Sequence, residues 1–142
     1  MNERDSGPAE NLNTLLRVEL AAVHAYHYAL RSLNGRLGAD SEKVHELAAG
    51  HGRNVAALQA CVRALGGAPA AEAGAWGSFT ILLDEFSVHR LLEAEKGGLA
   101  EYEAALPSLE GDVRELVEFE LMPRQRRHVA TLAGLLVTIR AA

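Results

Sequence analysis

The sequence contains an internal repeat, and each copy has the periodicity of a pair of helices. Residues 15–30 align without gaps on residues 91–106 at an offset of 76, and a second pair of segments aligns at an offset of 77. Apolar residues in all four segments recur at the spacing of an amphipathic helix, whereas the period-two alternation of strands is not sustained. The chain therefore predicts an all-α fold made of two similar helical hairpins.

Four helices are expected, and glycine and proline mark most of their ends. Asn-Gly follows the first helix, Gly-Gly follows the second, and Pro107 ends the third. Pro123 lies inside the fourth helix, where it is expected to kink the backbone. The expected ranges are about 11–34, 41–65, 84 or 87 to 106, and 111–140.

The connections between the helices determine the expected topology. The connections within each half look short, and short loops make neighbouring helices antiparallel. Residues 66–83 are rich in Ala and Gly and too long for a tight turn, so we expect them to cross the length of the bundle. Trp76 and Phe79 would then pack this crossover on the outside of the core. We expect a single domain over residues 1–142, with residues 1–10 as a flexible N-terminal segment.

Each predicted helix places one ionisable residue on its apolar face. These residues are Glu19, His51, Glu95 and His128. A buried carboxylate is costly unless it is paired, protonated or bound to a metal. Two carboxylates and two imidazoles are suitable ligands for iron, manganese or zinc. The sequence therefore predicts a metal site formed by these four side chains.

The same four residues also allow a purely structural interpretation. Each glutamate would then pair with the histidine of its own half in a buried, charge-assisted hydrogen bond. Tyr26 and Tyr102 would complete these networks. If a metal binds instead, we expect Tyr26, Asn54, Tyr102 and Gln125 to lie around the ligands as their hydrogen-bonding partners.

The remaining candidate side chains lie away from the centres of the apolar faces. His27 is at the edge of its face and is interpreted as a boundary residue, or alternatively as an outer partner of a metal ligand. His24 lies farther round, and His45 and His89 are expected to be solvated. Arg124 is expected either to face solvent or to pair with one of the inner carboxylates.

Composition excludes several classes of function. The net charge of −5 argues against nucleic acid as a partner, because phosphate binding needs clustered Lys and Arg. The single cysteine, Cys61, excludes an internal disulfide framework and a Cys-rich zinc module. The first residues carry no apolar secretory segment, and no run of about 18 apolar residues exists to span a membrane. We therefore expect a cytoplasmic protein with no membrane partner.

Several segments resemble the small bacterial ferritin-like four-helix proteins of unassigned function. The likeness covers most of the chain, from about residue 12 to residue 136. It implies an antiparallel ferritin-like four-helix bundle, that is, two helical hairpins joined by a long crossover. The segments that carry it read VELAAVHAYHYAL, HGRNVAALQACVRALGGAPA, AWGSF, LLEAEKGGLAEYEAAL and ELMPRQRRHVATL.

The resemblance also shows where this chain departs from di-iron proteins of the same superfamily. Those proteins use a Glu on the first and third helices and Glu-x-x-His on the other two. Glu19 and Glu95 match the lone glutamates, but residues 51–54 read His-Gly-Arg-Asn. In the fourth helix the motif falls on residues 125–128, Gln-Arg-Arg-His, or on residues 128–131, His-Val-Ala-Thr. Both bridging carboxylates are missing in either register, which implies one metal ion, or two held weakly.

The leading hypothesis is a ferritin-like protein that binds iron or zinc and takes part in handling metal or oxidative stress. We predict metal ligands but no catalytic residue, since no nucleophile motif or phosphate-binding loop occurs. The alternative is a non-enzymatic helical protein with a structural polar core and an exposed helix face that binds a partner. In either case we expect a small oligomer at most, such as a homodimer.

Overall fold

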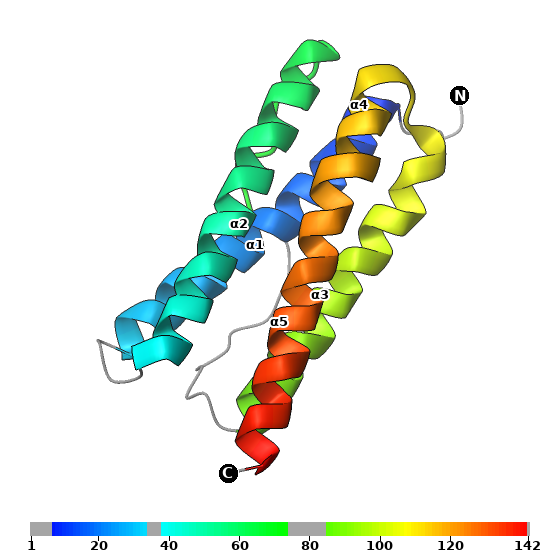
Figure 1. Ribbon diagram of the computed structural model, residues 1–142. Helices are drawn as coiled ribbons and strands as arrows, with labels where there is room; N and C mark the ends of the chain where they lie inside the picture. The colour runs from blue at the N-terminus through cyan, green and yellow to red at the C-terminus, as the bar shows by residue number, and fades with distance from the viewer. Residues whose placement is uncertain (1–6, 34–37, 74–84, 142) are drawn as a thin grey trace.

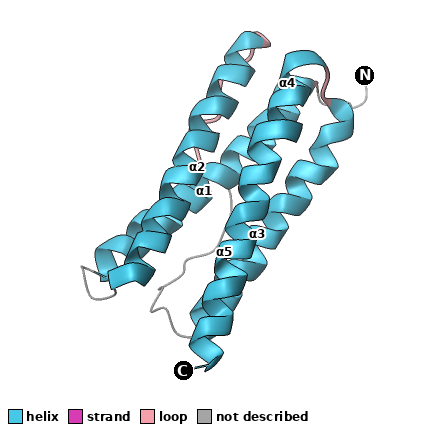
Figure 2. Ribbon diagram, in the orientation of Figure 1, coloured by secondary structure: helices cyan, strands magenta, loops and turns pink. Residues whose placement is uncertain are grey.

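The computed structural model describes residues 7–33, 38–73 and 85–141. Within these ranges every regular element is helical, so the predicted all-α class is confirmed (Figure 2). The elements in chain order are α1 (Pro8–Leu33), α2 (Gly38–Ala64), α3 (Glu85–Ala105), the 3₁₀ turn η1 (Leu106–Ser108), α4 (Gly111–Leu116), the π-helical turn η2 (Val117–Leu121) and α5 (Met122–Ala141).

The long helices form two hairpins. α1 packs against α2, and α3 packs against α5, as Figure 1 shows. Contacts of α1 with α3 and of α2 with α5 bring the hairpins together. The result is the predicted antiparallel four-helix bundle. None of the described helices has both the length and the apolar character that crossing a membrane requires.

Glycine ends α2 at the position that the sequence indicates. Gly66 has a φ of 81°, a left-handed conformation that glycine adopts without a Cβ penalty. The N–H of Gly67 donates to the carbonyl of Val62, and the N–H of Gly66 donates to the carbonyl of Arg63, both at 2.9 Å. These two bonds form a Schellman motif, which satisfies carbonyls that the last helical turn leaves without partners.

The first residues of the crossover are hydrogen-bonded to α1. The side chain of Asn13 donates to the carbonyl of Ala68 at 3.0 Å and accepts from the N–H of Ala70 at 2.7 Å. Asn13 is itself buried, so both ends of its amide are used where water is excluded. The predicted positions of Trp76 and Phe79 lie outside the described residues.

The irregularity expected at Pro123 is the π-helical turn η2. The N–H of Met122 donates to the carbonyl of Val117, five residues earlier rather than four. Proline has no N–H, and its ring crowds the carbonyl four residues before it. A widened turn directly before Pro123 relieves this crowding, and the helix then continues as α5. Gln125 and His128 lie on the first turns after this irregularity.

A layer of polar side chains divides the core into two apolar clusters. One cluster lies toward the α1–α2 loop and contains Ala22, Ala25, Tyr26, Val44, Leu47, Ala48, Val88, Leu91, Leu92, Leu132, Leu135 and Leu136. The other lies toward the opposite end and contains Leu12, Leu15, Leu16, Leu58, Cys61, Val62, Tyr102, Leu109, Val117, Leu121 and Met122. The four predicted site residues fall between these clusters on their helices, so apolar side chains cover the polar layer at both ends.

Candidate metal centre

The polar layer contains all four ionisable residues that the helical pattern places inward. Glu19, His51 and Glu95 are at most 1% exposed, and His128 is 5% exposed. Each comes from a different long helix, α1, α2, α3 and α5 in that order. Their predicted burial is therefore confirmed, and their contacts decide what the layer can do.

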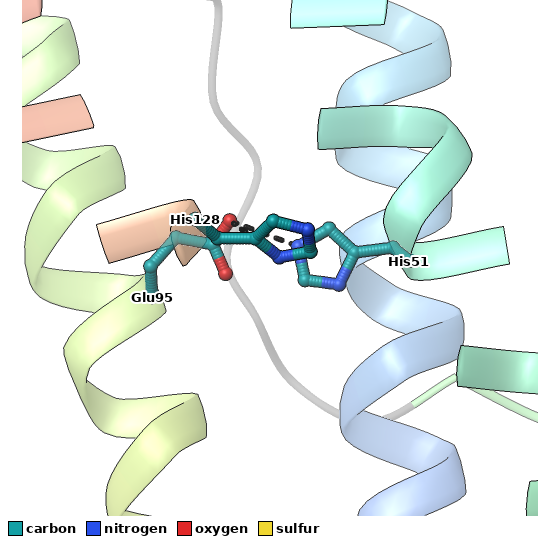
Figure 3. A group of neighbouring side chains, drawn as sticks. All are labelled: His51, Glu95 and His128. Carbon is teal, nitrogen blue, oxygen red and sulfur yellow. Dashed lines mark hydrogen bonds and ion pairs between the residues drawn. The ribbon is translucent and has the colours of Figure 1, made fainter. Parts of the chain in front are cut away.

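His51 lies between the two carboxylates. Its Nδ1 is 2.5 Å from Glu19 Oε1, and its Nε2 is 2.8 Å from Glu95 Oε2 (Figure 3 shows the second contact). A carboxylate only accepts hydrogen bonds, so both ring nitrogens of His51 carry a proton in this arrangement. The layer without a metal is thus a buried carboxylate–imidazolium–carboxylate triad.

Two tyrosines tie the carboxylates across the hairpins. Tyr26 of the first hairpin donates to Glu95 Oε2 of the second, and Tyr102 of the second donates to Glu19 Oε2 of the first, both at 2.7 Å. The ring of Tyr26 also stacks on that of His51, with centroids 5.3 Å apart. Tyr26 and Tyr102 thus lie beside the polar layer, and each of their bonds runs between the two halves.

His128 breaks the symmetry of the repeat. Its Nδ1 is 3.9 Å from Glu95 Oε2, too far for a hydrogen bond, so the pair expected within the second half does not form. Its ring lies 4.5 Å from that of His51 between centroids. Among the described residues, the buried Nδ1 has no hydrogen-bond partner. This orphaned nitrogen faces the carboxylate that His51 already engages.

The charges of the layer shift the pKa values of both histidines. Burial opposes the charged form of His51, but the charges of Glu95 and Glu19 outweigh it and raise its pKa from 6.5 to about 10. Burial lowers the pKa of His128, and the nearby charge of His51 lowers it further, to about 4. Burial would raise the pKa of the Glu95 carboxyl, but the charge of His51 and its hydrogen bond outweigh this effect. The pKa of Glu95 is therefore lowered. Near neutral pH the layer holds one charged and one neutral imidazole.

Gln125 fixes the orientation of Glu95. Its Nε2 donates to Glu95 Oε1 at 2.8 Å and to the Glu95 carbonyl at 2.9 Å. Gly98 gives it room, since a Cβ at that position would lie 3.1 Å from Gln125 Nε2. The buried Oε1 of Gln125 has no hydrogen-bond partner among the described residues. Gln125 is thus a direct hydrogen-bonding partner of Glu95.

Among the described residues, Asn54 forms no hydrogen bond with the four ionisable residues. It accepts a hydrogen bond from Arg124 Nη1 at 2.7 Å, and its own Nδ2 is buried without a partner among the described residues. Arg124 also pairs with the exposed Glu120 at 3.4 Å rather than with an inner carboxylate. Asn54 thus links α2 to α5, and its expected place around a metal stays a prediction.

Three of the four residues form one compact donor group. One ligand atom each from His51, Glu95 and His128 lies within 4.8 Å of the other two, and the three side chains point toward one another (Figure 3). It is the one such group of three or more within the residues that the structure describes. Glu19 lies outside it, at the Nδ1 edge of His51, whereas Glu95 meets Nε2.

Two residues that make the site possible were not identified from the pattern of polar residues. Gly50 on α2 leaves the space that the ring of His128 occupies, because a Cβ there would lie 2.4 Å from His128 Nε2. Gly98 does the same for Gln125. Glycines inside long helices cost about 1 kcal/mol of helix stability each, so they stand out in the sequence. A Cβ at Gly52 or Gly97 would meet nothing within 4 Å, so only the packed helices show which glycine has a role.

Comparison with known proteins identifies the fold. No protein-family model matches the chain, and no curated protein matches it. Among solved structures, a 2.6 Å structure of Rhodobacter capsulatus bacterioferritin matches with a TM-score of 0.67 and 18% sequence identity, over 94% of this chain and 81% of that chain. That bacterioferritin is described as having a metal-free dinuclear site and a haem iron. The bundle, its two hairpins and this structural match together show that the chain has the ferritin-like four-helix fold.

Proposed function

We propose that this protein binds one divalent transition-metal ion, iron or zinc, and serves in handling metal or oxidative stress. The observation that carries the proposal is the buried donor group of His51, Glu95 and His128, with ligand atoms within 4.8 Å of one another. Ligands that share a metal at about 2.0–2.2 Å lie roughly 3–4 Å apart. Closing this set around an ion requires side-chain movements that bring the three ligand atoms closer together.

The chemistry of the donors fits such an ion. His128 Nδ1 is buried and unpartnered among the described residues, so a metal would supply the partner it lacks. Glu95 is held by Gln125 on Oε1 and by Tyr26 on Oε2, which orients a carboxylate oxygen toward the histidines. Bound iron would supply redox chemistry, whereas bound zinc would supply a Lewis acid or a structural link.

We propose for Glu19 a role that differs from that of the three ligands. It contacts His51 on Nδ1, so with a metal at Nε2 it would orient the ring and raise its basicity as the carboxylate of a carboxylate–histidine–metal arrangement. Tyr102 holds Glu19 in turn. We therefore propose Glu19 as the positioning residue of His51, in place of the direct ligand role predicted from sequence.

A dinuclear centre does not fit the described donors. The layer holds two carboxylates and two imidazoles, and one of the carboxylates is engaged on the far edge of His51. Di-iron sites in this fold take four Glu and two His. The positions that would supply the bridging carboxylates carry His51 and either Gln125 or His128. The proposal is accordingly a single metal ion.

Metal binding must displace a proton from the triad. His51 Nε2 carries a proton toward Glu95 Oε2 in the metal-free layer, and a metal takes its place. We expect release of about one proton per ion near pH 7, and weaker binding as the pH falls. Calorimetric titration of the metal-free protein with Zn²⁺ in two buffers of different ionisation enthalpy measures this number. Proton release near zero would place the metal away from His51.

The first experiment is elemental analysis of untagged protein purified without chelator, together with thermal unfolding before and after chelation. Bound iron or zinc near one per chain, and a fall in Tm on chelation, are expected because a ligand of the folded state stabilises it. Glu95→Gln and His128→Ala should both abolish this effect. His89→Ala, an exposed histidine on α3, is the matched control.

Two results would contradict the proposal. One is a protein that remains metal-free after incubation with ferrous iron and with zinc. The other is unchanged metal content in Glu95→Gln and His128→Ala. In either case the polar layer would be a structural network, for which the closed triad of Glu19, His51 and Glu95 is already sufficient.

A further inference from the structure

Arg124 on α5 packs beside the polar layer. It stands one helical turn before His128, so the two side chains lie on the same face of the helix. Both are seated against Gly50 of α2, because a Cβ at that position would lie 2.4 Å from His128 Nε2 and 3.6 Å from Arg124 Cδ. The stem of Arg124 therefore lies next to the ring of His128, between α2 and α5.

Exposure rises in steps along this face of α5. The side chain of His128 is 7% exposed, that of Arg124 is 13% exposed, and that of Glu120, one turn farther toward the N-terminus, is 55% exposed. The side chains of the other three residues of the polar layer are at most 2% exposed. His128 is thus the most exposed member of the layer, and Arg124 lies between its ring and the solvated Glu120.

Two contacts hold the guanidinium of Arg124 in place. Nη1 donates to Oδ1 of the buried Asn54 at 2.7 Å, and Nη2 lies 3.4 Å from Oε1 of Glu120. The bond to the buried amide is the stronger of the two, because an exposed ion pair contributes little to stability. If the guanidinium turns outward, water can take its place at Asn54. Arg124 can therefore leave this position without unfolding either helix.

The charge of Arg124 acts against a cation in the layer. Burial and the charge of His51 are the larger causes that lower the pKa of His128, and the charge of Arg124 lowers it as well. A positive charge at this distance also repels a divalent ion. A residue that only supported the metal ligands would not need this charge, whereas a residue that restricts access would use it.

We propose that Arg124 controls the entry of the metal ion into the polar layer. In the described position it covers His128, and its movement toward solvent opens a route between α2 and α5 that ends at the proposed ligands. This proposal rests on the metal site proposed above. It goes beyond that site by naming the side of the bundle from which the ion arrives and the residue that the ion must pass.

The first test is a stopped-flow measurement of Zn²⁺ uptake by the full-length, metal-free protein. Arg124→Ala removes both the cover and the charge, so we expect uptake to be roughly 10-fold faster than in wild type. Release of zinc to a chelator should also be faster, because entry and exit use the same route. Arg127→Ala, which changes an exposed arginine of the same helix, is the matched control and should keep the wild-type rates.

A second measurement needs no metal. Diethyl pyrocarbonate acylates neutral imidazoles such as that of His128, and peptide mapping by mass spectrometry gives the rate at each histidine. In the metal-free protein, Arg124→Ala should react several-fold faster than wild type at His128 and equally fast at the exposed His89. Arg124→Met keeps most of the packed stem, so it serves if Arg124→Ala does not fold. It should speed zinc uptake but expose His128 less.

The outcomes separate this proposal from the metal site. Wild-type rates of zinc uptake and release in both Arg124 variants would overturn it and leave the metal site in place. A lower unfolding free energy with unchanged rates would show that Arg124 only links α2 to α5. Unchanged reactivity of His128 in Arg124→Ala would also overturn the proposal, because the ring would then not be covered. If wild type and variants all failed to bind zinc, the metal site would be contradicted, and this proposal with it.

Discussion

Gly50 is the residue on α2 that lets the ring of His128 enter the polar layer. A Cβ at this position would lie 2.4 Å from His128 Nε2 and 2.9 Å from its Cε1. We expect Gly50→Ala to lower the unfolding free energy by about 1–3 kcal/mol, as overpacking does in a filled interior. It should also weaken metal binding, because the ring must move away from Glu95. Urea unfolding and zinc titration measure the two effects.

Gly52, two residues along the same helix, is the matched control. A Cβ there would meet nothing within 4 Å, so Gly52→Ala should show only the helix preference for alanine, a gain of up to about 1 kcal/mol. Opposite signs at the two positions are therefore expected. If Gly50→Ala were as stable as Gly52→Ala and bound metal like wild type, the ring of His128 would not be seated against α2.

The helical pattern predicts which residues are buried, but not which of them touch. It identifies Glu19, His51, Glu95 and His128, because a residue's face on a helix follows from its spacing. The pairing of Glu95 with His51 instead of His128 depends on axial offsets and side-chain rotamers, which only the packed bundle sets. The space at Gly50 likewise depends on the distance between α2 and α5. These features could not be predicted from one helix at a time.

At the scale of the helices, two tyrosine–carboxylate bonds join one hairpin to the other. Tyr26→Phe and Tyr102→Phe each remove one donor from a buried carboxylate and leave the ring in place. We expect each to lower the unfolding free energy by about 1–3 kcal/mol, because bonds to charged groups are the stronger ones. Tyr26→Phe should also weaken metal binding more than Tyr102→Phe, since Tyr26 holds the proposed ligand Glu95. Equal effects of the pair on zinc affinity would contradict the ligand assignment.

The arrangement of the elements was largely predictable, and the exceptions have local causes. Glycine marks the end of α2 because the Schellman motif needs the left-handed φ of Gly66. Pro123 indicates an irregularity in the last helix, but several backbone adjustments can accommodate a proline. The sequence does not distinguish a bend from the π-helical turn that occurs. α1 begins at Pro8, three residues before the expected start, since proline is well suited to a first helical position.

For the whole molecule, the polar layer makes stability depend on pH in both directions. The folded protein binds its His51 proton up to about pH 10, whereas an unfolded histidine releases it near 6.5. This contribution is fully present below pH 6.5 and is lost as the pH rises toward 10. His128 behaves in the opposite way, because its folded pKa is about 4. Its contribution is lost as the pH falls from 6.5 toward 4.

The metal-free protein should accordingly be most stable near pH 6.5, with the lowered pKa of Glu95 steepening the acid side. Urea unfolding in the presence of chelator, from pH 4 to 9, measures this profile. His51→Gln removes the imidazole whose proton the two carboxylates hold above neutral pH. The loss of unfolding free energy between pH 6.5 and 9 should therefore become smaller. His89→Gln, on the surface of α3, should leave both sides unchanged. If the alkaline decline survived in His51→Gln, the triad would not hold a charged imidazole, and a metal entering the layer would have no proton to displace.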